Sequence, residues 1–87
     1  METQSAELVA VVNRIKRAQG QLGGVLRMIE EARDVDAVLH QLKAVSNALD
    51  RAGFAMIASE WRRASEAGEQ LPPDRMDQLE KLFLSLA

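Results

Sequence analysis

Apolar residues recur at intervals of seven along the first third of the chain, in two rows offset by three positions. The first row is Leu8, Ile15, Leu22 and Ile29, and the second row is Val11, Ala18 and Val25. Seven residues are close to two turns of an α-helix, so both rows fall on one side of it. The pattern predicts a long amphipathic helix over residues 5–31.

A second segment repeats this pattern. Its first row is Val35, Leu42, Leu49 and Met56, and its second row is Val38, Val45, Ala52 and Ser59. Asp34 precedes the run at the position of an N-cap, so "EEARD" is predicted to form the turn between two helices. Arg62 and Arg63 lie near the other end, where cations favour the helix dipole. We therefore predict a second helix over residues 34–64.

The segment "SEAGEQLPP" interrupts the period with Gly68 and a pair of prolines. Pro73 is compatible with the first turn of a helix, where its missing N–H costs no hydrogen bond. The residues that follow predict a short helix over residues 73–86, with one apolar side made of Met76, Leu79, Leu82, Phe83 and Leu86.

Two long antiparallel helices and one short one leave much of each apolar stripe uncovered. We therefore expect a single all-α domain over residues 1–87 that forms an obligate homodimer, in which the long helices build a four-helix bundle. With 87 residues, the chain is also small for burying a stable core alone.

Composition narrows the function classes. The chain has no cysteine, so it offers neither disulfides nor thiolate ligands. Residues 1–7 are polar and do not resemble a signal peptide, and no apolar stretch approaches the roughly 18 residues that a membrane crossing needs. We expect a cytoplasmic protein without a membrane partner.

Charge is unevenly distributed along the chain. The net charge is −2, yet residues 1–29 carry four bases and two acids. Between Glu7 and Glu30 there is no acid, while the bases of this segment are Arg14, Lys16, Arg17 and Arg27. A helical wheel at 100° per residue puts these bases on or beside the arc that faces away from the apolar rows.

Three glycines occupy the same arc of the first helix, namely Gly20, Gly23 and Gly24. Each costs about 1 kcal/mol relative to alanine in a helix interior. The close approach of another backbone would justify that cost, and it can come from a neighbouring helix or from a phosphate chain. Charge and glycines together favour a phosphate-contacting surface, although a solvated basic face is the simpler alternative.

The run "RIKRAQGQLGGVLRMIEE", followed by "DAVLHQLKAVSNALDRAG", resembles the CsoR/RcnR family of bacterial metal-responsive transcriptional repressors. The resemblance covers residues 14–60 without a gap, and the short acidic third segment completes the expected length. It implies an all-helical dimer that pairs into a flat tetramer and binds double-stranded operator DNA without a helix-turn-helix.

The family's DNA surface uses arginine and glutamine side chains of the first helix. Carried over by motif position, these are Arg14, Arg17 and Gln21. Further DNA-binding candidates rest only on charge and expected exposure, and they are Lys16, Arg27, Lys43 and Arg51.

The sequence departs from the family at the metal ligands. Where copper-sensing members have a cysteine, a histidine and a second cysteine, this chain has Val35, Glu60 and Ala64. Cu(I) prefers thiolates, and valine and alanine offer no donor. The resemblance therefore implies a sensor site that has been lost or replaced, and we expect neither bound Cu(I) nor another cofactor.

Other residues are weak candidates to replace the missing metal ligands. His40 is the single histidine and lies outside both apolar rows, which is typical of a surface residue. Glu60 and Glu80 are carboxylates that can approach each other, although a salt-bridging or capping role is the simpler expectation. Trp61 is expected to pack under the "SEAGEQLPP" loop rather than to stack on a partner.

Three hypotheses for function remain at this stage. The first is a DNA-binding repressor with an unknown small-molecule effector, an unusual metal or no effector. The second is an interaction module that co-assembles with a ligand-bearing paralogue. The third, an enzyme resembling helical chorismate mutases, is disfavoured because the heptad core is apolar and no nucleophile–base pair or phosphate loop is visible.

Overall fold

The computed structural model describes residues 6–87 and contains three helices joined by two short connections. They are α1 (Ala6–Glu30), α2 (Val35–Glu66) and α3 (Pro73–Leu86), and no strand occurs within these residues. The all-α prediction is therefore confirmed. α2 extends two residues further than expected, and the predicted start of α1 at residue 5 lies outside the described residues.

Backbone hydrogen bonds close the end of α1. The N–H of Arg33 donates to the carbonyl of Met28 at 2.9 Å, and the N–H of Ala32 donates to that of Ile29 at 3.0 Å. Ala32 has φ 56°, a left-handed conformation that helix ends usually assign to glycine. Asp34 occupies the N-cap position of α2 as predicted, but its side chain makes no capping hydrogen bond.

A comparable motif ends α2. Gly68 has φ 72°, and the N–H of Glu69 donates to the carbonyl of Ala64 at 2.9 Å. Pro73 then opens α3, where its fixed φ suits the first turn.

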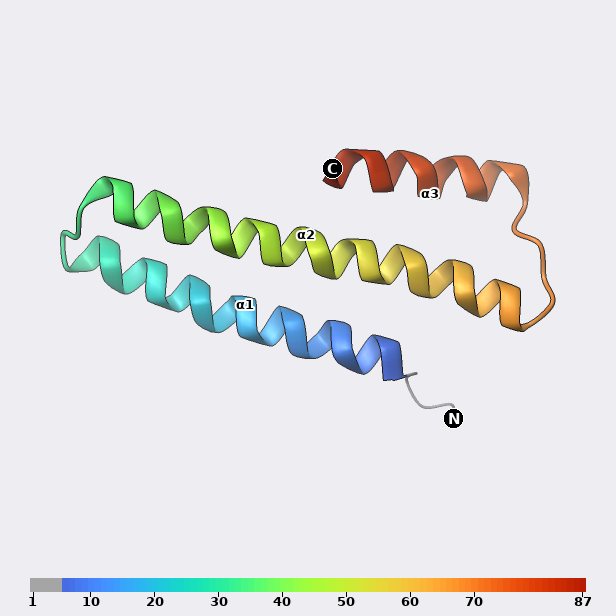
Figure 1. Cartoon of the computed structure of the whole chain (residues 1–87), viewed down its shortest axis with the longest axis horizontal. Coiled ribbons are helices and arrows are strands. Elements are labelled where there is room, and N and C mark those ends of the chain that lie inside the picture. The colour runs from blue at the N-terminus through green and yellow to red at the C-terminus, as the bar shows by residue number, and fades with distance from the viewer. Residues whose placement is uncertain (1–5) are drawn as a thin grey trace.

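The three helices lie side by side in a single layer, with α2 between α1 and α3 (Figure 1). The Cα atoms span 53 × 29 × 12 Å, and their radius of gyration is 16.8 Å. A compact chain of this length would have a radius of gyration of about 12 Å. A layer one helix thick exposes both faces, which is why none of the larger side chains within residues 6–87 is buried beyond 98%.

Packing separates the two heptad rows. The second-row residues form the contact between α1 and α2, and their buried members are Val11, Ala18, Val25, Val45, Ala52 and Ser59. The first row remains open to solvent, with Ile29 57% and Val35 66% exposed. Because α1 and α2 are antiparallel, the first rows of both helices lie on the same face of the layer. One face is consequently apolar and without a cover in the single chain.

α3 docks on the side of α2 that is turned away from α1 (Figure 1). Leu79 is its buried contact at 2% exposure, and the rings of Phe54 and Phe83 pack with centroids 5.0 Å apart. Gly53 permits the close approach, because a β-carbon there would lie 2.7 Å from Cδ1 of Leu86. None of the helices in residues 6–87 has the length and apolar character that crossing a membrane requires.

Candidate nucleic-acid interface

A groove between α1 and α2 gathers three arginines on the face opposite the first-row residues. It has a volume of about 390 Å³, and its lining residues are Arg14, Arg17, Ala18, Gln21, Ala48 and Arg51. We call it the arginine groove. Arg14, Arg17 and Gln21 follow one another at spacings of three and four, so helix geometry stacks them along α1.

Antiparallel packing brings the fourth polar side chain into the arginine groove. Arg51 comes from α2, and the small side chains of Ala18 and Ala48 leave the groove floor open between the helices. The motif residues Arg14, Arg17 and Gln21 are thus joined by a residue that the sequence supported through charge alone. Ala48 escaped the sequence reasoning, although its position three residues before Arg51 puts it on the same side of α2.

A second groove continues from the first towards the turn. Arg17 and Gln21 line both, and the second has a volume of about 640 Å³. Its further lining residues are Gly20, Gly24, Val25, Arg27, Met28, Glu31, Arg33 and Gln41. We call it the glycine groove, because Gly20 and Gly24 line it.

The glycines explain where the guanidinium group of Arg27 lies. A β-carbon added at Gly24 would be 3.7 Å from Nη2 of Arg27, and one added at Gly23 would be 3.9 Å from Nη1. Arg27 therefore runs back along α1 over these two glycines. Gly20 has no neighbouring atom within 4 Å of an added β-carbon, so no helix of the described chain accounts for its presence.

The cations of these grooves have no acidic partner, with one exception. Within residues 6–87, no ion pair involves Arg14, Arg17, Arg27 or Arg51. The exception is Arg33, whose Nε lies 3.3 Å from Oε1 of Glu31 at the edge of the glycine groove.

The remaining two DNA-binding candidates lie apart from the grooves. Lys16 borders a shallow hollow with Ala10 and Asn13, next to Arg14 and Arg17. Lys43 is exposed on the outer edge of α2 and lines neither groove. The structure thus gathers five of the seven predicted residues and separates Lys43 from them.

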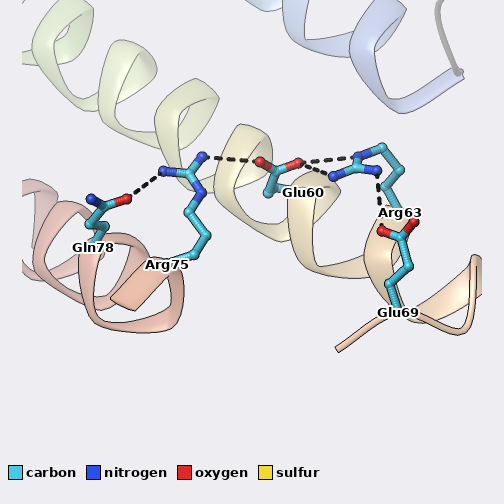
Figure 2. A network of polar contacts seen from close by, with 5 residues as sticks. All are labelled: Glu60, Arg63, Glu69, Arg75 and Gln78. Atoms are coloured by element: carbon cyan, nitrogen blue, oxygen red, sulfur yellow. Dashed lines mark hydrogen bonds and ion pairs between the residues drawn. The ribbon is translucent and has the colours of Figure 1, made fainter. Parts of the chain in front are cut away.

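Cations near the end of α2 have a different environment, which Figure 2 shows. Glu60 lies between two arginines: its Oε2 accepts a hydrogen bond from Nη2 of Arg75 at 3.0 Å, and its Oε1 accepts one from Nη2 of Arg63 at 2.9 Å. Arg63 also approaches Glu69 at 4.0 Å, and Arg75 donates to Gln78 at 3.2 Å. We call Glu60, Arg63 and Arg75 the α3 latch, because they connect α2 to α3.

The hydrogen bonds from Arg75 and Arg63 lower the pKa of the Glu60 carboxyl below its usual value. Glu60 is therefore a carboxylate that two cations already hold. The expectation that Glu60 forms salt bridges is confirmed, and its partners are Arg63 and Arg75. A further ion pair joins Arg62 to Glu7 at the start of α1.

The three positions at which the resembling family carries metal ligands do not assemble within one chain. Val35 and Glu60 lie 25 residues apart on α2, roughly 37 Å along the helix axis. Val35 is exposed and Ala64 is buried. Within residues 6–87, no group of three histidine, cysteine, aspartate or glutamate side chains is placed to hold a metal ion.

Trp61 and His40 were the two other candidate residues. Trp61 is half-buried and lines a hollow together with Leu71 of the α2–α3 connection, and its Nε1 donates to Sδ of Met76 at 3.1 Å, so it lies beside this connection as predicted. His40 is exposed on α2.

Comparisons with known proteins agree with this architecture. A family model described as metal-sensitive transcriptional repressor matches residues 7–85. The copper-sensing transcriptional repressor CsoR of Mycobacterium ulcerans (strain Agy99) is 42% identical over 48 residues, which cover 55% of this chain and 41% of that protein. The protein of the same name from Mycobacterium tuberculosis (strain ATCC 25618 / H37Rv) is 36% identical over 53 residues, covering 61% and 44%.

These matches span less than half the length of the curated relatives. No solved structure matches the chain at a comparable level of significance.

Proposed function

The chain belongs to the family of metal-sensitive transcriptional repressors, and we propose that it represses transcription by binding duplex operator DNA through the arginine groove. Proteins of this family are transcriptional repressors and not enzymes. The observation that carries the proposal is the convergence of Arg14, Arg17 and Arg51 in one groove without an acidic partner among residues 6–87.

Unpaired guanidinium groups suit the phosphates of DNA. Arginine offers a planar fork of donors that matches phosphate oxygens, and it stays charged at every physiological pH. Gln21 adds a neutral donor and acceptor between the two grooves. Binding of such a surface releases counterions from the DNA, so its affinity falls steeply with salt.

The apolar face supports assembly of two chains. The first-row residues of α1 and α2 lie together on one face, and residues such as Leu42 and Leu49 are more than 40% exposed in the single chain. Packing that face against a second copy buries the row and completes a four-helix bundle. The grooves lie on the opposite face and stay accessible, which also suits a tetramer that presents several basic surfaces to one duplex.

The family name implies a metal, and the residues of this chain do not fit one at the inherited positions. Val35 and Ala64 carry no donor atom, and the carboxylate of Glu60 is held by Arg63 and Arg75. The chain has no cysteine to supply a thiolate for Cu(I). We therefore propose that the sensor site of this repressor has been lost or replaced. Membership of a family of transcriptional repressors supports a cytoplasmic location, where the DNA lies.

The test is DNA binding measured by fluorescence anisotropy across a salt series, with a duplex from upstream of the protein's own gene. The double variant Arg14→Ala/Arg17→Ala should weaken binding by about 100-fold and reduce the salt slope by about 2, because two phosphate contacts are lost. Its helicity by circular dichroism and its mass in solution should equal those of the wild type.

A matched control is Arg62→Ala, which removes a cation that Glu7 already balances and that lines neither groove. Its affinity should stay within about threefold of the wild type. Equal affinities of the wild type and the double variant would refute the arginine groove. If the wild type binds no duplex even at low salt, the interaction module that pairs with a paralogue becomes the better hypothesis.

A further inference from the structure

The glycine groove, with a volume of about 640 Å³, has no role in the function proposed for the arginine groove. It continues directly from the arginine groove, since Arg17 and Gln21 line both. Its charged lining residues are Arg17, Arg27, Arg33 and Glu31, so it carries an excess of two positive charges. This charge favours an anionic occupant, and the shared residues allow an occupant of the arginine groove to continue into this groove.

The backbone of α1 is open at Gly20, where an added β-carbon would have no neighbouring atom within 4 Å. Three glycines weaken the interior of α1, and no atom of the described chain fills the space at Gly20. An extended, narrow anion can use this opening to contact the helix backbone directly, whereas a bulky side chain from a folded partner needs a pocket with walls.

Arg27 lies where an extended anion in the glycine groove would end. Its guanidinium lies over Gly23 and Gly24, and no acid pairs with it within residues 6–87. Arg14 and Arg27 are separated by about 20 Å along the helix axis. That distance matches roughly six base-pair steps of a duplex.

We propose that the glycine groove binds the sugar-phosphate backbone of the same duplex, so that one DNA strand runs from the arginine groove past Gln21, lies against α1 at Gly20 and Gly24, and ends on Arg27. This inference rests on the proposed function and extends it. In this proposal the glycines allow the DNA backbone to approach α1 closely, and Arg27 contacts a phosphate.

The sharpest test is Gly20→Ala, because its expected effects have opposite signs. The added methyl group meets no atom of the protein and favours the helix, so the thermal midpoint should rise by about 4 °C. The same methyl group holds the phosphate backbone away from α1, so affinity for the upstream duplex should fall about tenfold.

Asn47→Ala is the matched control. Asn47 is an exposed residue of α2 that lines neither groove, and its replacement also favours the helix. This variant should have a raised thermal midpoint and the DNA affinity of the wild type. Arg27→Gln provides a second measurement and should lower the salt slope by about 1 without changing helicity.

The results separate this inference from the proposed function. A Gly20→Ala variant with a raised midpoint and unchanged DNA affinity overturns the inference, while the effect of Arg14→Ala/Arg17→Ala still tests the arginine groove. If Gly20→Ala instead changes the mass of the protein in solution, the glycine groove holds a second copy of the chain and the inference is wrong.

Discussion

The arginines of the arginine groove and those of the α3 latch are the same residue type on neighbouring helices, but their surroundings are opposite. Arg14, Arg17 and Arg51 share a groove without an acid, whereas Arg63 and Arg75 hold Glu60 at 2.9 and 3.0 Å. The N–H groups of a paired arginine donate hydrogen bonds to acceptors of the same chain. An unpaired one keeps these groups available for a partner outside the chain, which is the role that we propose for Arg14, Arg17 and Arg51.

The two regions also differ in the contacts that hold their helices together. The grooves lie over a contact of small second-row side chains such as Ala18 and Val45, while α3 is held by a few larger contacts and one charge network. Changes at the latch should therefore alter stability and leave DNA affinity nearly constant, in contrast to the charge deletions in the arginine groove.

Leu79→Ala should cause the largest loss of stability that leaves DNA affinity nearly unchanged. Leu79 is the buried contact of α3, so truncation leaves a cavity and lowers the free energy of unfolding by about 3 kcal/mol. Thermal and urea unfolding would measure this loss. DNA affinity, determined well below the midpoint, should remain within about threefold of the wild type; a loss as large as that of the groove double variant would show that α3 and the grooves are one unit.

Glu60→Gln should have a smaller effect that depends on pH. At pH 7 the variant should lose about 0.5–1 kcal/mol of unfolding free energy, because Arg63 and Arg75 lose their shared carboxylate. The folded-state pKa of Glu60 is lowered, so its contribution is complete above the usual value of 4.5 and disappears as pH falls through the folded pKa.

The difference between wild type and Glu60→Gln should accordingly be constant from pH 7 to about pH 5 and shrink below pH 4.5. Urea unfolding at several pH values would measure it. Gln78→Ala is a suitable control, since it removes a neighbour of Arg75 without removing a charge. A difference between wild type and Glu60→Gln that does not vary with pH would contradict the role given to the carboxylate.

The smallest expected effect is a gain in stability from Ala32→Gly. Ala32 has φ 56°, where an L side chain is strained and glycine is not. We expect the unfolding free energy to rise by about 0.5 kcal/mol after the entropic cost of glycine is subtracted. Because Ala32 itself lines neither groove, DNA affinity should not change, and a change would show that the conformation of the turn affects the glycine groove.

The heptad period predicted α1 and α2, and the apolar side that follows Pro73 predicted α3; the bounds that lie within residues 6–87 agree to within two residues, because burial in a helix follows sequence spacing closely. It did not predict which row forms the contact within one chain. Ile15 and Val11 both fit the period, and only the packing of α2 on α1 buries Val11 and leaves Ile15 exposed. That choice depends on the rotation of each helix about its axis, which the spacing does not contain.

The candidate site was predicted in part for a similar reason. Arg14, Arg17 and Gln21 could be placed together from their spacing on one helix. Arg51 joined them only through the pairing of two antiparallel helices, and Arg75 reaches Glu60 only because α3 docks on α2. Ala32 gave no signal either, since alanine is common in helices and rare at positive φ.

The thinness of the layer has a consequence for how much protein a cell must make. The layer is 12 Å thick and buries mainly small side chains between its helices, so we expect the larger part of the interior to form when another copy lies against its apolar face. Folding and assembly then become a single step that depends on chain concentration. If the proposed dimer forms, we expect chains below the assembly threshold to stay unfolded, so that repression rises more steeply than the amount of protein.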